Sequence, residues 1–443
     1  RILSLMKEQT KIPKNKIGRA SKLAQTGIQV GVNYLKYKAR KTITGNDDKT
    51  AFHEATARQT YDTFSKLKGG PLKLAQMLSM DRNMVPDQYA DQFAQAQYKA
   101  PPLTYPLVVN TFMKELDKRP TEIFDHFTTK AASGASIGQV HQAEIKGEKY
   151  AVKIQYPGVA DSLKSDLAIV KPLATRIFQL DSKAIEPYMK EVEERLLEET
   201  NYHLELERSQ DLAAKSKHLA HTRFPEYFPE LSSKRILTME WIHGVHLDTF
   251  AESDAPQELK QKLAQALWDF YHHQIHELRL FHADPHPGNF KIHDDELWVL
   301  DFGCTKSLED DFYKDYFALM DPDVLNDEST FRNALCKIGL LLDTDKPHEK
   351  DKLADLFRDS VELLSRPFKH GTFDFGDRSY FDELAQLGED ARLDQELTKL
   401  STSRGNAHAL YLNRTYFGLY HLVGSLNATI TTTLPDYSAT KQA

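Results

Sequence analysis

Three side chains suited to phosphoryl transfer lie within one short stretch of the sequence. Asp284 precedes Asn289 by five residues, and Asp301 follows as the first residue of Asp-Phe-Gly. A carboxylate and an amide supply oxygen ligands for Mg²⁺, and a second carboxylate can orient the attacking oxygen. Two strand-like runs flank residues 294–296, so a hairpin is expected to bring the two loops together. The stretch 281–303 therefore predicts a phosphoryl-transfer site.

The order of these residues is that of a kinase catalytic loop, Asp-x4-Asn followed by Asp-Phe-Gly. The rest of a nucleotide site should lie upstream, and Lys153 in Ala-Val-Lys-Ile would contact the α- and β-phosphates. An acid should pair with Lys153 from the following helical stretch. Four residues of that stretch are candidates: Glu198, Glu199, Glu205 and Glu207.

A turn of small residues and a hinge complete the predicted nucleotide site. Residues 131–139 lie where a phosphate loop would, and small residues let backbone N–H groups approach phosphates. Residues 239–244 follow a strand at the position where a hinge offers backbone groups to adenine. The predicted nucleotide-binding residues are Ser133, Gly134, Ala135, Ser136, Gly138, Gln139, Lys153, Met239, Glu240 and Ile242.

With these motifs, the sequence resembles the UbiB/AarF family of atypical protein-kinase-like proteins, tied in many organisms to ubiquinone biosynthesis. The resemblance covers residues 55–305, and His-Ala-Asp-Pro-His-Pro-Gly-Asn at 282–289 is characteristic of the family. Residues 133–140 match its alanine-rich loop. The resemblance implies an ATPase or small-molecule kinase that binds ATP and Mg²⁺. It assigns Asp284, Lys153 and Glu205 to catalysis and Asn289 and Asp301 to the metal.

The resemblance also implies a regulatory contact. The family's Lys-x-Gly-Gln motif falls on residues 73–76, and its Glu-x-Asp motif falls on residues 199–201. The implied regulatory residues, which would fold over the active site and contact one another, are Lys73, Gln76, Glu199 and Asn201. The chain departs from the family pattern at Ala75, Asn201 and Gly134. Because Asn201 carries no charge, the contact of Lys73 is expected to rest on Glu199.

The periodicity of apolar residues predicts an α+β, two-lobed protein-kinase-like fold with a small β-containing N-lobe, a helical C-lobe and an N-terminal helical extension. The expected strands are 140–145, 150–154 and 235–241, and the expected helices include 107–116 and 186–218. After residue 256 the pattern is helical except over 281–303. The predicted parts are a basic leader 1–44, an extension 45–100 carrying Lys-x-Ala-Gln, an N-lobe 101–243 and a C-lobe 244–443.

Composition and charge restrict the class of protein. The chain of 443 residues is 40% hydrophobic and 27% charged, which is typical of a globular protein, and two cysteines exclude a disulfide scaffold. Residues 1–44 contain eleven basic residues and one acid, so this leader carries +10 and the remainder −17. An acidic body argues against nucleic-acid binding, whereas the leader suits an anionic surface.

These features predict a cytoplasmic location, peripheral at a membrane, with an anionic lipid or an isoprenoid-quinone precursor and the members of a lipid-biosynthesis complex as partners. A transmembrane segment is not expected in this chain, because no apolar run reaches the length needed to span a bilayer. The first residue is Arg1 and not Met, which predicts an upstream piece that was removed or not included.

Two alternative functions stay open from the sequence. A genuine protein kinase is the first, although no Ala-Pro-Glu follows Asp301 and Ala283 stands before the catalytic Asp. A zinc-dependent hydrolase is the second, because five histidines fall between His272 and His286. Their order is not His-Glu-x-x-His, so the general-base carboxylate would be misplaced. A nucleotide-binding scaffold without turnover is disfavoured, since the expected catalytic residues are all present.

Overall fold

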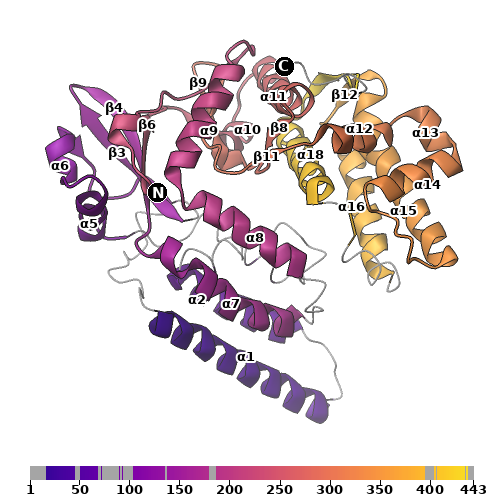
Figure 1. Ribbon diagram of the computed structural model, residues 1–443, viewed down its shortest axis with the longest axis horizontal. Helices are drawn as coiled ribbons and strands as arrows, with labels where there is room; N and C mark the ends of the chain where they lie inside the picture. Colours follow the sequence, from indigo (N-terminus) through magenta and orange to yellow (C-terminus); the bar gives the residue numbers. More distant parts are fainter. Residues whose placement is uncertain are drawn as a thin grey trace. The chain divides into compact units, whose positions relative to one another are not determined.

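The computed structural model describes residues 16–44, 50–67, 103–134, 137–178, 186–394 and 407–434, together with residues 71, 89, 92, 404, 405, 436 and 437 (Figure 1). The chain divides into two compact units. The first holds residues 1–207 and 226–241, and the second holds 208–225 and 242–443. The chain crosses between the units more than once, and its last crossing, between Trp241 and Ile242, is close to the lobe boundary expected at 243. Residues 208–225, expected in the N-lobe, belong to the second unit.

Long helices form one part of the first unit. They are α1 Lys16–Thr44, α2 Thr50–Leu67, α7 Val159–Phe178 and α8 Glu186–Glu199. α1 packs against both α2 and α7, and the hydroxyl oxygens of Thr26 and Thr63 lie 2.8 Å apart between α1 and α2. α1 lies within the part of the chain predicted as a basic leader. α7 was not predicted, and Pro172 inside it interrupts the helical signal.

An antiparallel sheet forms the other part of the first unit. Its strands are β1 His126–Phe127, β2 Ser133–Gly134, β3 Gly138–Ile145, β4 Glu148–Gln155 and β6 Ile236–Glu240, with β3 and β4 between β1 and β6. The strands expected over 140–145 and 150–154 are confirmed and form the β3–β4 hairpin, whose turn residues Lys146 and Gly147 both have positive φ, as a type I′ turn requires.

Two helices cover this sheet through an aromatic core. α5 Tyr105–Glu115, which confirms the helix expected over 107–116, and α6 Pro120–Ile123 precede the first strand. Phe112, Phe124 and Phe127 pack with Val152 of β4 in one buried cluster. The short 3₁₀-helix η3 Pro229–Leu231 leads into β6.

The single helix predicted over 186–218 was wrong. The structure has α8 ending at Glu199 and a separate helix, α9 Tyr202–Lys215. The backbone N–H of Tyr202 donates to the carbonyl of Lys234, 3.0 Å away, and therefore cannot continue the α8 hydrogen-bond ladder. The run of Glu, Leu and Lys has helical composition on both sides of this break, so its pattern gives no sign of the tertiary hydrogen bond.

Helices predominate in the second unit. They are α10 Leu247–Ala251, α11 Gln257–His272, α12 Asp310–Ala318, α13 Pro322–Asn326, α14 Glu328–Lys337, α15 Pro347–Ser365, α16 Arg378–Leu393 and α18 Ala407–Ser425, with the π-helix η4 His273–Leu278 and the 3₁₀-helices η5 Pro287–Asn289 and η6 Arg366–Phe368. Their core includes fully buried Trp268, Tyr271, Phe317 and Tyr420. Among the described residues, no helix is both long and apolar enough to cross a membrane.

Short strands connect these helices. One sheet has the order β5 Thr222–Arg223, β10 Glu296–Val299, β9 Phe290–His293 and β7 Val245–His246, and two strand pairs are β8 Leu280–His282 with β11 Thr305–Ser307 and β12 Gly371–Asp374 with β13 Thr429–Thr432. The predicted β9–β10 hairpin is confirmed. The expectation of helix outside 281–303 missed β11, β12 and β13. A strand of three or four residues is too short to show alternation, and a turn signal such as the one at residues 294–296, which marked β9 and β10, was not recognised beside these strands.

Candidate active site

A buried ion pair joins Lys153 to Glu205 in the first unit. Lys153 lies in β4 between Val140 of β3 and Leu237 of β6, and Glu205 lies in the first turn of α9. The Lys153 Nζ and Glu205 Oε1 atoms are 2.6 Å apart, with side-chain exposures of 11% and 5%. The structure therefore selects Glu205 from the four acids that the sequence left open.

The ring of Tyr202 adds to this environment. Lys153 Nζ lies 5.1 Å from the ring centroid, a separation at which a cation is attracted to the aromatic face. Sheet, helix and ring thus surround the ammonium group on several sides. Removing a charge from water costs free energy unless the charge has a partner. Glu205 therefore both offsets the cost of burying the Lys153 ammonium and fixes its position.

The predicted phosphate loop is only partly described. Ser133 and Gly134 form β2, which pairs with β3, while Ala135 and Ser136 lie outside the described residues. A Cβ on Gly138 would approach the Ile154 carbonyl oxygen to 2.5 Å, so close backbone packing already requires glycine there. The nucleotide contacts of these residues stay a prediction.

Gln139 is turned into the protein. Its side chain is 1% exposed, and its Oε1 accepts a hydrogen bond from the Leu103 N–H at 2.7 Å. Its Nε2 lies 2.8 Å from Nε2 of His141. The structure therefore gives Gln139 a role in anchoring the chain before α5, which sequence spacing did not suggest.

The hinge residues lie where β6 ends. Met239 is buried, the N–H of Glu240 donates to the Glu226 carbonyl at 2.7 Å, and the Ile242 carbonyl accepts from Lys291 Nζ at 2.8 Å. The N–H of Trp241 also donates, to the Lys149 carbonyl at 3.0 Å, so at least three backbone groups in this stretch are used within the protein. Because these backbone groups are bonded within the protein, they do not supply the contacts with adenine that were predicted for residues 239–242.

Hydrogen bonds join the two loops of the second unit that carry the predicted catalytic residues. The Ala283 N–H donates to the Cys304 carbonyl at 2.8 Å, and the Leu300 N–H donates to the Asn289 carbonyl at 2.9 Å. The paired strands β8 and β11 adjoin the first bond, and the β9–β10 hairpin adjoins the second. This framework brings the loop of Asp284 and Asn289 beside the loop of Asp301.

Short-range bonds orient the expected metal ligands. Asn289 Nδ2 donates to the Asp284 carbonyl at 2.9 Å, which leaves Oδ1 as the acceptor of that amide. The Gly303 N–H donates to Asp301 Oδ1 at 2.7 Å. Asp284, Asn289 and Asp301 are all half-buried and reachable from solvent. Hard oxygen donors on adjoining loops fit Mg²⁺, which Asn289 and Asp301 would hold and which would neutralise phosphate charge when bound.

Comparison with known families finds a match over most of the region described above. The ABC1 atypical kinase-like domain matches residues 95–334, more than half of the 443 residues. The chain belongs to this family. The resemblance to the UbiB/AarF family inferred from the motifs is confirmed, and so is the α+β kinase-like fold.

Individual relatives of this ABC1 family chain carry kinase names. The probable serine/threonine-protein kinase abkA of Dictyostelium discoideum is 26% identical over 411 residues, which cover 85% of this chain and 72% of abkA. The mitochondrial atypical kinase COQ8B of Danio rerio is 25% identical over 397 residues, which cover 86% of this chain and 62% of COQ8B. The chain thus spans less than two thirds of COQ8B.

A solved structure shares the fold. The structure of Rv3197 from Mycobacterium tuberculosis, in a complex with erythromycin, matches with a TM-score of 0.57 and 23% identity. The match covers 86% of this chain and 94% of the other. This likeness supports the kinase-like fold of the ABC1 family chain.

The regulatory motifs of the ABC1 family chain are partly described. Lys73 and Gln76 lie outside the described residues. Glu199 is the last residue of α8, and Asn201 occupies the break before α9. The Asn201 Oδ1 atom is buried and accepts no hydrogen bond from the described part of the chain. The motif therefore lies at the base of the helix that carries Glu205.

Of the five histidines from His272 to His286, His272 and His276 are held in the helical core, and the five do not form a metal centre among themselves in the described part of the chain. His272 stacks on Trp268, and burial lowers its pKa to about 3. His276 is bonded to the hydroxyls of Tyr313 and Tyr416, and burial lowers its pKa well below the ordinary value. These rings belong to the helical core of the ABC1 family chain, which removes the basis for a zinc hydrolase built from this cluster.

Proposed function

We propose that the chain binds Mg²⁺–ATP and acts as an atypical kinase or ATPase. The main support for this proposal is the buried ion pair of Lys153 and Glu205. Burying an ion pair costs free energy, and a need to hold the lysine in position for the phosphates of ATP would explain that cost. Asp284 would orient the attacking oxygen. Asn289 and Asp301, on the adjoining loops, would hold the metal. Kinase names among the relatives support the same class of reaction.

Water or a small molecule is the proposed acceptor of the phosphoryl group. α12 begins at Asp310, only nine residues after Asp301, and no Ala-Pro-Glu lies between them. A protein kinase uses a longer segment at this place to dock its peptide substrate. The short connection therefore supports ATP hydrolysis or small-molecule phosphorylation, with protein phosphorylation as the alternative.

Radiolabelled ATP tests the acceptor. With Mg²⁺ and γ-labelled ATP, we expect the chain to release phosphate or label a lipid extract, and to leave generic peptide substrates unlabelled. Each reaction is run with and without vesicles, and phosphate release is quantified beside peptide labelling. Robust peptide labelling would support the protein-kinase alternative, and binding of ATP without any turnover would reject the enzyme.

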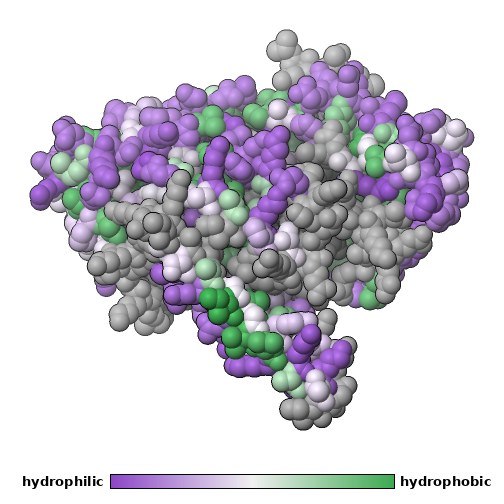
Figure 2. All heavy atoms as spheres, turned by 60° about the horizontal axis from the view of Figure 1, so that its bottom comes forward, coloured by the Kyte–Doolittle hydropathy of each residue, from purple (hydrophilic) through white to green (hydrophobic). Residues whose placement is uncertain are grey.

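A membrane surface is the proposed location, and an isoprenoid-lipid or ubiquinone pathway is the proposed context. α1 contains seven basic residues and no acid over Lys16–Thr44. Large apolar side chains are nevertheless exposed on it, with Ile28 at 70% and Leu35 at 66%. Figure 2 shows apolar residues gathered among hydrophilic ones at the bottom of the view. Basic and apolar groups on one helix suit insertion into an anionic membrane interface.

A charge-matched pair of variants tests this role of α1. Ile28→Glu with Leu35→Glu should weaken binding to anionic vesicles at least about tenfold, because burial of each large side chain contributes about 1.5–3 kcal/mol. Gln25→Glu with Gln29→Glu makes the same charge change at exposed polar positions. It should weaken binding less, and high salt should weaken parent binding. Equal losses in both double variants, measured by vesicle co-sedimentation, would contradict an apolar contribution.

The buried oxygen of Asn201 supports the proposed regulatory contact. A buried acceptor is normally satisfied by a donor, and the described residues supply none for Oδ1. The implied donor is Lys73, whose motif in the family contacts the Glu-x-Asp pair. We therefore propose that residues 73–76 regulate access to the nucleotide through Glu199 and Asn201.

A further inference from the structure

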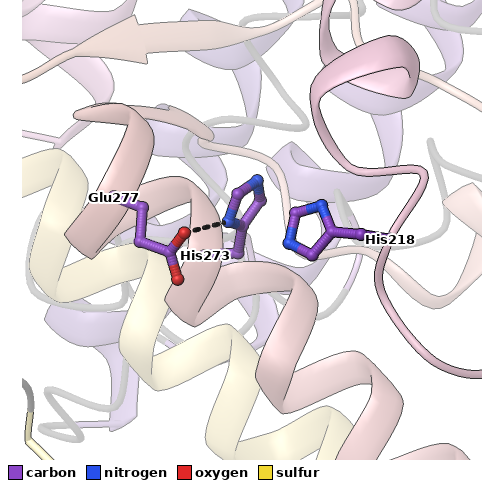
Figure 3. Close-up of side chains that lie close together, drawn as sticks. All are labelled: His218, His273 and Glu277. Atoms are coloured by element: carbon purple, nitrogen blue, oxygen red, sulfur yellow. Dashed lines mark hydrogen bonds and ion pairs between the residues drawn. The ribbon is translucent and has the colours of Figure 1, made fainter. Parts of the chain in front are cut away.

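Two histidines and a glutamate gather in the second unit, on residues that the phosphoryl-transfer site does not use. His218, His273 and Glu277 each offer a ligand atom, and these three atoms lie within 4.8 Å of one another (Figure 3). His273 is buried, whereas His218 and Glu277 are exposed. The group is therefore open to solvent on one side and anchored on the other.

The elements bring these residues together for identifiable reasons. His273 and Glu277 are four residues apart on the π-helix η4, so their side chains share one helix face. π-helical turns are rare and are often found at functional sites. His218 follows the last residue of α9 by three positions, and its ring meets that of His273 edge to face with centroids 4.7 Å apart.

The hydrogen bonds of His273 define which atom could bind a metal. Its Nε2 lies 3.2 Å from the carbonyl oxygen of Lys215, and a carbonyl only accepts, so Nε2 carries the hydrogen. Its Nδ1 lies 2.9 Å from Glu277 Oε2. In the neutral ring, Nδ1 then presents a lone pair toward a carboxylate oxygen. A cation between these two atoms would satisfy both.

We propose that His218, His273 and Glu277 bind one divalent transition-metal ion, with Zn²⁺ favoured by the ligand set. Two imidazoles and one carboxylate are common zinc ligands, and a fourth position would remain for water. The Lys215 carbonyl supplies the outer-shell contact that typically orients a metal-bound histidine. Ligand atoms around tetrahedral zinc lie about 3.3 Å apart, which the exposed side chains can reach by rotation.

The site differs in chemistry from the proposed Mg²⁺ site. Imidazole nitrogen suits zinc and its neighbours in the periodic table, whereas Mg²⁺ prefers oxygen ligands and water. A bound ion would join the segment after α9 to η4 and would stabilise the second unit, by an amount that increases with the ratio of ion concentration to dissociation constant. Titration with Co²⁺ or Zn²⁺ measures metal binding without ATP, so a negative result would leave the proposal of ATP binding intact.

Cobalt and zinc titrations of the untagged, chelator-treated full chain test the proposal. We expect one Co²⁺ per chain with absorption bands of tetrahedral coordination, displacement of Co²⁺ by one Zn²⁺, and no displacement by millimolar Mg²⁺. His218→Ala and Glu277→Gln each remove a ligand from an exposed position, so folding should persist. Each should raise the Zn²⁺ dissociation constant at least about tenfold. Removing an outer-shell partner of a metal already lowers affinity about 10- to 100-fold, and these residues are direct ligands.

Matched controls distinguish this site from adventitious binding by surface histidines. His370→Ala and Glu309→Gln change exposed residues of the same types in the same unit and should leave the dissociation constant unchanged. Zinc should also raise the melting temperature of the parent and the controls, but not that of His218→Ala. Unchanged affinity in His218→Ala and Glu277→Gln, or equal losses in the controls, would overturn the proposal.

Discussion

Replacing Glu205 with alanine is expected to lower the free energy of unfolding by about 3–5 kcal/mol, because the ammonium of Lys153 would stay buried without its partner. The 2.6 Å contact and the low exposure of both side chains show that this is a buried ion pair, so the cost of an unpaired buried charge applies. The same change should weaken ATP binding, since a lysine without its acid no longer has a fixed position. Chemical denaturation and nucleotide titration measure the two effects.

Glu207 provides the matched control. It lies two residues further along α9 and is exposed, so Glu207→Ala should change stability by less than about 0.5 kcal/mol. A Lys153→Met, Glu205→Leu double variant should recover stability without recovering ATP binding, because it leaves no buried charge unpaired. If Glu205→Ala and Glu207→Ala behave alike in both assays, the pair has neither the structural nor the functional importance assigned to it.

The second large effect concerns Asp284. Replacing it with asparagine should lower ATP turnover by about 10²- to 10⁴-fold, the range that a positioned acid or base contributes. Mg²⁺–ATP binding should persist, because Asn289 and Asp301 would still hold the metal. Single-turnover kinetics and equilibrium binding on the same preparation separate the two quantities. Turnover in Asp284→Asn at the parent rate would contradict the catalytic assignment.

Asp295 offers a control for this substitution. It is an exposed residue of the β9–β10 turn with positive φ, a backbone conformation that asparagine also adopts readily. Asp295→Asn makes the same chemical change in the same hairpin region. It should leave both turnover and binding at the parent values, so any general effect of removing one negative charge would be detected.

The parts of the site that follow local rules could be predicted from the sequence. The β3–β4 and β9–β10 hairpins have turn residues between strand-like runs, and both are present. The loop of Asp284 and Asn289 was expected to adjoin the loop of Asp301, because a hairpin lies between them, and the structure confirms that placement, while the catalytic role stays a prediction. Such features are formed by residues close together in the sequence, so the types and spacing of those residues are enough to predict them.

Features that depend on tertiary contacts could not be predicted. The break between α8 and α9 depends on a hydrogen bond from Tyr202 to Lys234, far along the chain. The helical pattern alone could not choose Glu205 over Glu207, because the choice requires the direction of each side chain on α9, and only the family resemblance assigned Glu205. His218 joins His273 only through the fold, so a search for local zinc motifs could not find the pair.

Asn289 and Asp301 are proposed to hold Mg²⁺ for a bound nucleotide, and thermal stabilisation by ATP, measured as a function of Mg²⁺ concentration, is the decisive experiment for this role. A ligand that binds only the folded state raises the melting temperature, and the rise grows with the logarithm of the ligand concentration once this exceeds the dissociation constant. The parent should be stabilised by ATP in a Mg²⁺-dependent manner, and Asp301→Asn should lose that dependence. Equal Mg²⁺-dependent stabilisation of Asp301→Asn and the parent would contradict the assignment of the metal site.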